Sequence, residues 1–214
     1  MATAAFESIL PSIVPFPVPR PLQKLLSHVL GIDEIVRVYD HLQTRKEAGS
    51  IADRLLNFLD ISLCISASDL KHVPESGSAI VAVNHPFGIL DGAILASLLT
   101  RVRPDVRFLA NGILTVLPEL RELVIPVDPI SGRSAVGKNG RGLRHSIEHL
   151  RRGGMLVVFP AGEVAHFRWR VGAVTDAEWN PAVARLVSIA GAPVVPMYIS
   201  GANGPAFQIA GAAQ

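Results

Sequence analysis

The chain has 214 residues, enough for one well-packed domain, and 49% of them are hydrophobic. Its mean hydropathy of +0.37 is high, but no window holds the roughly 18 uninterrupted apolar residues of a membrane span, so we expect no transmembrane helix. Twenty Lys and Arg stand against eighteen Asp and Glu, which is too even a balance for a typical nucleic-acid-binding protein.

The single cysteine, Cys64, has no partner for an internal disulfide, so we expect a cytoplasmic protein. Basic residues concentrate between residues 133 and 152, where only Glu148 opposes them. This segment is expected to hold an anion or to rest on anionic headgroups.

Residues 1–60 are predicted to form an N-terminal helical region that contacts the membrane. Apolar residues recur at helical spacing in Leu22–Leu30, Asp33–Leu42 and Ile51–Leu59, and Asp33 and Ser50 are expected as N-caps. Five prolines between residues 9 and 22 exclude a continuous helix there.

Residues 61–214 are predicted to form an α/β core. The alternation over 61–66 indicates a half-exposed strand, and short apolar runs indicate buried strands. Those runs are Ala79–Val83, Val106–Ala110, Val124–Val127, Met155–Phe159 and Val194–Ile199, separated by helical stretches at Leu90–Leu99, Arg141–Arg152 and Pro181–Ala190. We therefore predict a layered α/β domain with a mixed, largely parallel central sheet flanked by helices. After Gly201 no closing element is evident, and we expect the chain to be a piece of a longer protein.

The most informative stretch follows the first buried strand and reads Asn84-His85-Pro86-Phe87-Gly88-Ile89-Leu90-Asp91-Gly92. Pro86 and Gly88 end the strand, and the loop can fold His85 and Asp91 toward each other. In such a pair the carboxylate fixes the imidazole tautomer while the other ring nitrogen accepts a proton from a hydroxyl. The alternative is that His85 caps the strand and Asp91 caps the helix.

Two further blocks are expected near the same edge of the sheet. Phe159-Pro160-Ala161-Gly162-Glu163 follows a buried strand, and Val194-Val195-Pro196 places a proline inside a strand, which indicates an edge or a bulge. Ligands of parallel sheets collect beyond the carboxyl ends of strands.

In this order, the three blocks resemble the lysophospholipid and glycerolphosphate acyltransferase superfamily. The first block resembles a bacterial hemolysin-like subgroup, some of whose relatives acylate lyso-ornithine lipid. The resemblance implies that His85 is the base that activates the acceptor hydroxyl and that Asp91 orients it. It also implies a donor that is acyl-CoA or acyl carrier protein, a lipid acceptor, no cofactor or metal, and a site on the inner face of the cytoplasmic membrane.

The sequence departs from the family pattern at three points. Five residues separate His85 from Asp91 where the family has four, Ala161 replaces a Glu that returns as Glu163, and Val164 stands where an Arg is expected. The residues expected to bind substrate are Asn84, Gly88, Arg133, Lys138, Arg141, Pro160, Gly162 and Glu163. For each of the three basic residues, a solvated loop or helix face is an equal interpretation.

Two rival functions stay open. His145, Glu148 and His149 fit the pattern of inverted zinc peptidases. Leu143, Ile147 and Leu150 are expected to form the buried stripe of the same helix, which places the two histidines and Glu148 on its polar side. A non-catalytic lipid-binding protein would keep the apolar surface and the basic segment but would have no use for His85.

Overall fold

A computed structural model of the protein describes residues 32–44, 48–128 and 135–212. Within these ranges the chain divides into two compact units. One combines the described residues up to Ser62 with Ile113–Arg121, and the other combines Leu63–Gly112 with the described residues from Glu122 onward. The predicted helix Leu22–Leu30, the proline-rich segment and Arg133 lie outside the described residues.

The first unit contains helices α4 (Ile32–Thr44) and α5 (Ile51–Phe58) and the 3₁₀ turn η2 (Pro118–Leu120). Ser50 caps α5 as predicted, since its Oγ accepts the Asp53 N–H at 3.2 Å and Asp53 accepts the Ser50 N–H at 3.0 Å. The prediction for Asp33 is wrong, because α4 begins at Ile32 and an N-cap must precede the helix. The Tyr39 hydroxyl donates to Glu119 at 2.9 Å and ties α4 to η2.

The predicted strand over residues 61–66 is also wrong. These residues form no regular structure, and Leu63 and Ile65, on one side of the alternation, are exposed. A period-2 pattern produces a strand only where a neighbouring strand or core receives its apolar side. Ser66 instead caps the short helix α6 (Ala67–Leu70), accepting the Ser68 N–H at 3.1 Å.

Five of the predicted strands form the central sheet of the second unit, counted within the described residues. They are β1 (Ala79–Val83), β2 (Val106–Asn111), β3 (Val124–Val127), β4 (Met155–Val158) and β7 (Val194–Met197), in the order β3-β2-β4-β1-β7. Every pairing is parallel, which confirms the predicted α/β class. The two strands that contain a proline, β3 with Pro126 and β7 with Pro196, are the edges, where a missing amide donor is tolerated.

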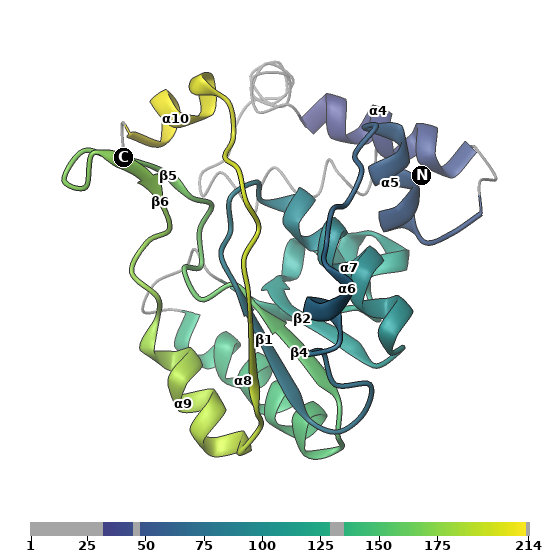
Figure 1. Ribbon diagram of the computed structural model, residues 1–214, viewed down its shortest axis with the longest axis vertical. Helices are drawn as coiled ribbons and strands as arrows, with labels where there is room; N and C mark the ends of the chain where they lie inside the picture. Colours follow the sequence, from purple (N-terminus) through teal and green to yellow (C-terminus); the bar gives the residue numbers. More distant parts are fainter. Residues whose placement is uncertain (1–31, 45–47, 129–134, 213–214) are drawn as a thin grey trace. The chain divides into compact units, whose positions relative to one another are not determined.

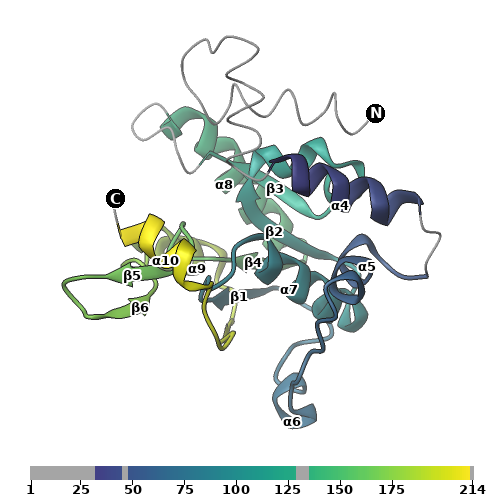
Figure 2. The ribbon, with the colours of Figure 1, turned by 90° about the horizontal axis from the view of Figure 1, so that it is seen from above.

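Three helices cover the two faces of this sheet. Helix α7 (Ile89–Val102) connects β1 to β2, whereas α8 (Ala135–Arg151) and α9 (Pro181–Ala190) connect strands in the opposite direction along the sheet. Since parallel crossovers are right-handed, opposite directions place helices on opposite faces. Figures 1 and 2 show α7 on one side of the strands and α8 and α9 on the other.

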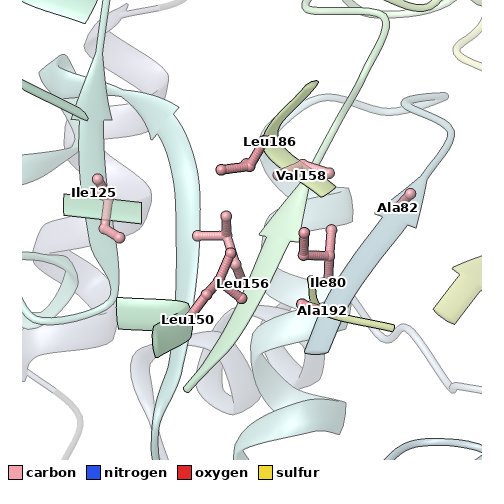
Figure 3. Close-up of a cluster of buried hydrophobic side chains, with 8 residues drawn as sticks. All are labelled: Ile80, Ala82, Ile125, Leu150, Leu156, Val158, Leu186 and Ala192. Carbon is pink, nitrogen blue, oxygen red and sulfur yellow. The ribbon is translucent and has the colours of Figure 1, made fainter. Parts of the chain in front are cut away.

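The core between the sheet and α8 and α9 is built from alternate strand residues. Ile80 and Ala82 of β1 and Leu156 and Val158 of β4 pack with Leu150 of α8, as Figure 3 shows, and Leu186 of α9 joins the same cluster. The predicted buried stripe of α8 is correct for Leu150 but wrong for Leu143, which is exposed. Gly142 and Ser146 face the sheet instead, because a Cβ at Gly142 would lie 2.7 Å from the carbonyl oxygen of Pro126.

Two elements of the second unit were not predicted. Strands β5 (His166–Arg168) and β6 (Ala173–Thr175) form an antiparallel hairpin, and helix α10 (Pro205–Ala212) packs against β5. The expectation of no closing element after Gly201 is therefore wrong. None of the helices in the described part of the chain is long and apolar enough to cross a bilayer. The 3₁₀ turn η1 (Gly112–Val116) directly follows β2.

The starting ends of three strands are joined by one buried cation, Arg103. Its guanidinium donates to the carbonyl oxygens of Gly77 at 2.8 Å and Gly153 at 2.6 Å, just before β1 and β4 begin. It also grips both carboxylate oxygens of Asp105, at 2.6 and 2.7 Å, just before β2. The hydrogen bonds from Arg103 hold the pKa of Asp105 below its usual range.

Arg103→Met should lower the free energy of unfolding by at least about 2 kcal/mol, because this buried side chain loses several charge-assisted hydrogen bonds to carbonyl groups and to Asp105. Arg152→Met, the same change at an exposed position of the second unit, should stay within about 0.5 kcal/mol. Urea unfolding of both variants measures this difference. Equal effects would show that Arg103 does not join the strand ends.

Asp105→Asn should destabilise the protein at neutral pH but not in acid. A carboxylate whose folded pKa is depressed stabilises the fold above its unfolded pKa, and this contribution disappears as the pH falls through the folded value. The urea midpoints of parent and variant should therefore converge between about pH 5 and the folded pKa. A difference that stays constant over that range would contradict the assignment.

Candidate active site

The loop after β1 brings His85 and Asp91 together. His85 Nδ1 lies 2.8 Å from Asp91 Oδ2, although five residues separate them. The additional residue is accommodated by a sharp turn at Gly88, whose φ of 80° and ψ of −121° are open to glycine but strained for other residues. The loop thus folds His85 and Asp91 toward each other as predicted.

Asp91 is fully buried in the first turn of α7, and its contacts converge on one atom. Besides the His85 ring, Oδ2 accepts the N–H groups of Phe87 at 2.8 Å and Gly88 at 2.9 Å. These amides and the positive end of the helix dipole compensate the buried negative charge. The other oxygen, Oδ1, is buried and has no hydrogen-bond partner among the described residues.

This contact determines which nitrogen of His85 is available for chemistry. With a carboxylate as its partner, Nδ1 carries the proton, so Nε2 presents its lone pair as a base. The side chain keeps 18% of its surface exposed, and its ring stacks on Phe159 with centroids 4.1 Å apart. Phe159 comes from the end of β4, so the first two motif blocks meet at the imidazole.

The backbone of His85 is held from both sides by distant residues. Its N–H donates to Asp176 Oδ1 at 3.1 Å, and its carbonyl accepts the Ala165 N–H at 2.8 Å. The other oxygen of Asp176 accepts the indole N–H of Trp179 at 2.9 Å. Sequence reasoning did not find Asp176, since a lone carboxylate 91 positions from His85 carries no motif signal.

Asn84, expected to bind substrate, makes structural contacts. Its side-chain amide donates to the Ile199 carbonyl at 2.8 Å, and its oxygen accepts the Ile199 N–H at 2.7 Å. The amide therefore extends the β1–β7 pairing beyond the end of the strands. Asn203 adds a bond to the Pro86 carbonyl at 3.1 Å, so the chain after β7 fastens the loop at two points.

The loop after β4 places the other predicted residues as follows. The Pro160 carbonyl accepts the Asn180 N–H at 2.9 Å, and Gly162, with a φ of 71°, closes a turn by donating to the Phe159 carbonyl at 3.0 Å. Glu163 forms an ion pair with Arg168 of β5. The structure thus engages Glu163 in the hairpin.

The basic candidates lie toward the far side of the sheet. Arg141 is exposed on α8, and Lys138 belongs to the same helix, which follows β3. Three strand spacings, about 14 Å in all, separate β3 from β1. The same helix carries His145, Glu148 and His149. The ring of His149 bonds to the Met155 carbonyl at 3.0 Å, and no group of three potential metal ligands occurs among the described residues.

Comparisons with known proteins fit this geometry. A family model described as acyltransferase matches residues 20–212. The chain is also similar to a protein named lyso-glycine lipid O-acyltransferase from Phocaeicola vulgatus, with 27% identity over 192 residues. That alignment covers 89% of this chain and 65% of the relative, so the chain spans less than two thirds of the relative's length.

Gly88→Ala should destabilise the protein by about 1–3 kcal/mol, because alanine is strained at a φ of 80° and its Cβ would lie 3.2 Å from Val164. Gly92→Ala is the matched control four residues later. It has open space and an ordinary helical position, so it should stabilise α7 by about 0.5–1 kcal/mol. Thermal unfolding of the two variants tests this opposition in sign, and two shifts of the same sign would contradict it.

Proposed function

The chain belongs to the acyltransferase family, and on that premise we propose that it transfers a fatty acyl group from a thioester donor to a hydroxyl of a lipid acceptor. The observation that carries the proposal is the 2.8 Å contact between His85 Nδ1 and the buried Asp91 carboxylate. An imidazole fixed in this way is a general base, and acyl transfer to an alcohol needs one.

The proposed reaction is a single displacement. Nε2 of His85 takes the proton of the acceptor hydroxyl while its oxygen attacks the thioester carbonyl, and a carbon–oxygen bond forms. The tetrahedral intermediate then expels the thiolate as the carbon–sulfur bond breaks, and the imidazolium returns its proton to that sulfur. Asp91 stabilises the imidazolium between the two steps.

The acceptor class is proposed from the relative and from the loop after β4. The relative's name specifies a lysolipid and acylation on oxygen. Val164 lacks the charge of the arginine that the superfamily places there to grip glycerol phosphate, which favours a different headgroup. We propose that Arg141 and Lys138 of α8 meet the anionic part of an extended lysolipid. The donor is acyl-CoA or acyl carrier protein.

His85→Ala should lower acceptor-dependent thiol release by about 10²–10⁴-fold, the usual contribution of a general base. Asp91→Asn should also lose activity, because a neutral amide keeps the loop contacts but no longer stabilises the imidazolium. His72→Ala removes an exposed histidine of the second unit and should leave the rate unchanged. The measurement uses long-chain acyl-CoA and acyl carrier protein, each with lysophospholipids, glycerol phosphate, lyso-ornithine lipid and lyso-glycine lipid.

The rival functions predict different results. A non-catalytic lipid-binding protein would bind the acceptors and release no thiol with any pair, although folded. A zinc peptidase would lose its activity to a chelator and would depend on His145 and His149. Release that persists in His85→Ala would refute the proposed base.

A further inference from the structure

The hairpin of β5 and β6 carries an exposed apolar tip, which we define as residues 169–172. Trp169 is 76% exposed and Val171 62%, and Arg170 between them is also exposed. Figures 1 and 2 both show the hairpin extending away from the central strands beside α10. Large apolar side chains at a projecting turn are costly in water unless something covers them.

We propose that the hairpin tip inserts into the surface of a bilayer that contains anionic lipids. The proposal deepens the proposed function and rests on it, because a lysolipid acceptor is itself a component of a membrane. It names the segment of this chain that meets the lipid surface, in addition to the predicted contact of residues 1–60.

The chemistry of the tip matches a bilayer interface. Tryptophan prefers the headgroup level, where its ring is in apolar surroundings and its N–H stays hydrated. Valine adds apolar area, and an arginine extends its guanidinium toward phosphate groups. Gly172, with a φ of 70°, permits the tight turn that places these side chains at the end of the hairpin. Phe207 of α10, the helix that packs against β5, is exposed as well.

The ends of the hairpin are fastened to the catalytic loop. Ala165, just before β5, donates its N–H to the His85 carbonyl at 2.8 Å. Asp176, just after β6, accepts the His85 N–H at 3.1 Å. The hairpin is therefore inserted between the two residues that hold the backbone of His85, and docking of its tip holds the imidazole near the layer where the acceptor hydroxyl lies.

A lipid surface explains the tip better than an acidic protein partner does. Recognition of an acidic protein usually relies on several cations. Here Arg168 is paired with Glu163, and the tip itself contributes one cation, the exposed Arg170 between Trp169 and Val171 in the sequence. That composition favours shallow insertion supported by one charge.

The test measures binding of the 214-residue chain to sedimented vesicles, without an acyl donor. Vesicles of phosphatidylcholine alone are compared with vesicles containing phosphatidylglycerol. The double variant Trp169→Ser, Val171→Ser should bind both kinds at least about tenfold more weakly. Arg170→Ser should lose about fivefold on anionic vesicles and nothing on neutral ones. Ile189→Ser is the matched control, since Ile189 is 53% exposed in the last turn of α9, outside the hairpin.

Trp169 also packs edge-to-face on Phe167, so replacing it removes a contact within the hairpin. The single variant Val171→Ser keeps that contact, and circular dichroism shows whether each variant is folded. A second measurement uses the two tryptophans of the chain. In Trp179→Phe, the remaining Trp169 should be quenched by bromine-labelled lipids. No quenching, no vesicle binding by the parent chain, or equal binding by the tip variants would overturn the proposal. Loss of binding to acyl carrier protein with unchanged vesicle binding would do so too, in favour of a protein partner.

Activity with a short-chain, water-soluble acceptor keeps the two proposals distinguishable. The tip variants should retain activity with this acceptor and lose it with acceptor embedded in vesicles. If no acceptor is acylated but vesicle binding still depends on the tip, the proposed function fails and the docking surface stands.

Discussion

The site depends on one buried oxygen atom, Oδ2 of Asp91. It accepts hydrogen bonds from the His85 ring and from two backbone amides of the intervening loop. Burying this charge without those partners would cost several kcal/mol, so the loop conformation and the orientation of the imidazole are set together. The same contact explains how a loop with five residues between His85 and Asp91 still holds the imidazole by Nδ1 and leaves Nε2 for the acceptor hydroxyl.

The sequence was sufficient to predict the sheet and the pair at its edge. Continuous apolar runs such as Ala79–Val83 have a direct physical cause, since strands covered on both faces have no polar side. The strand predicted at residues 61–66 does not form, because no strand in the described part of the chain pairs with it. The burial predicted for Leu143 is wrong because α8 approaches β3 closely at Gly142, where a Cβ would not fit. Asp176 became recognisable only when folding placed it against the backbone of His85.

The two ends of the central strands have different roles. At the end where the strands begin, Arg103 donates to backbone carbonyls and to the Asp105 carboxylate, and these contacts serve stability. At the end where the strands finish, glycines, prolines and polar side chains shape the loops around His85. The hairpin proposed to dock on lipid lies at this second end of the strands. The contacts of Arg103 that stabilise the fold are therefore separate from the surface that would meet lipid.

The anchoring of the catalytic loop has a consequence for biosynthesis. Asn84 bonds to Ile199, which lies 115 positions later, and Pro86 bonds to Asn203. A ribosome makes His85 long before it makes the residues that fasten its loop. Until then β1 lacks its neighbour β7 and the loop has no anchor on that side. A nascent chain that ends before β7 therefore lacks both the last strand of the sheet and the contacts that hold the catalytic loop.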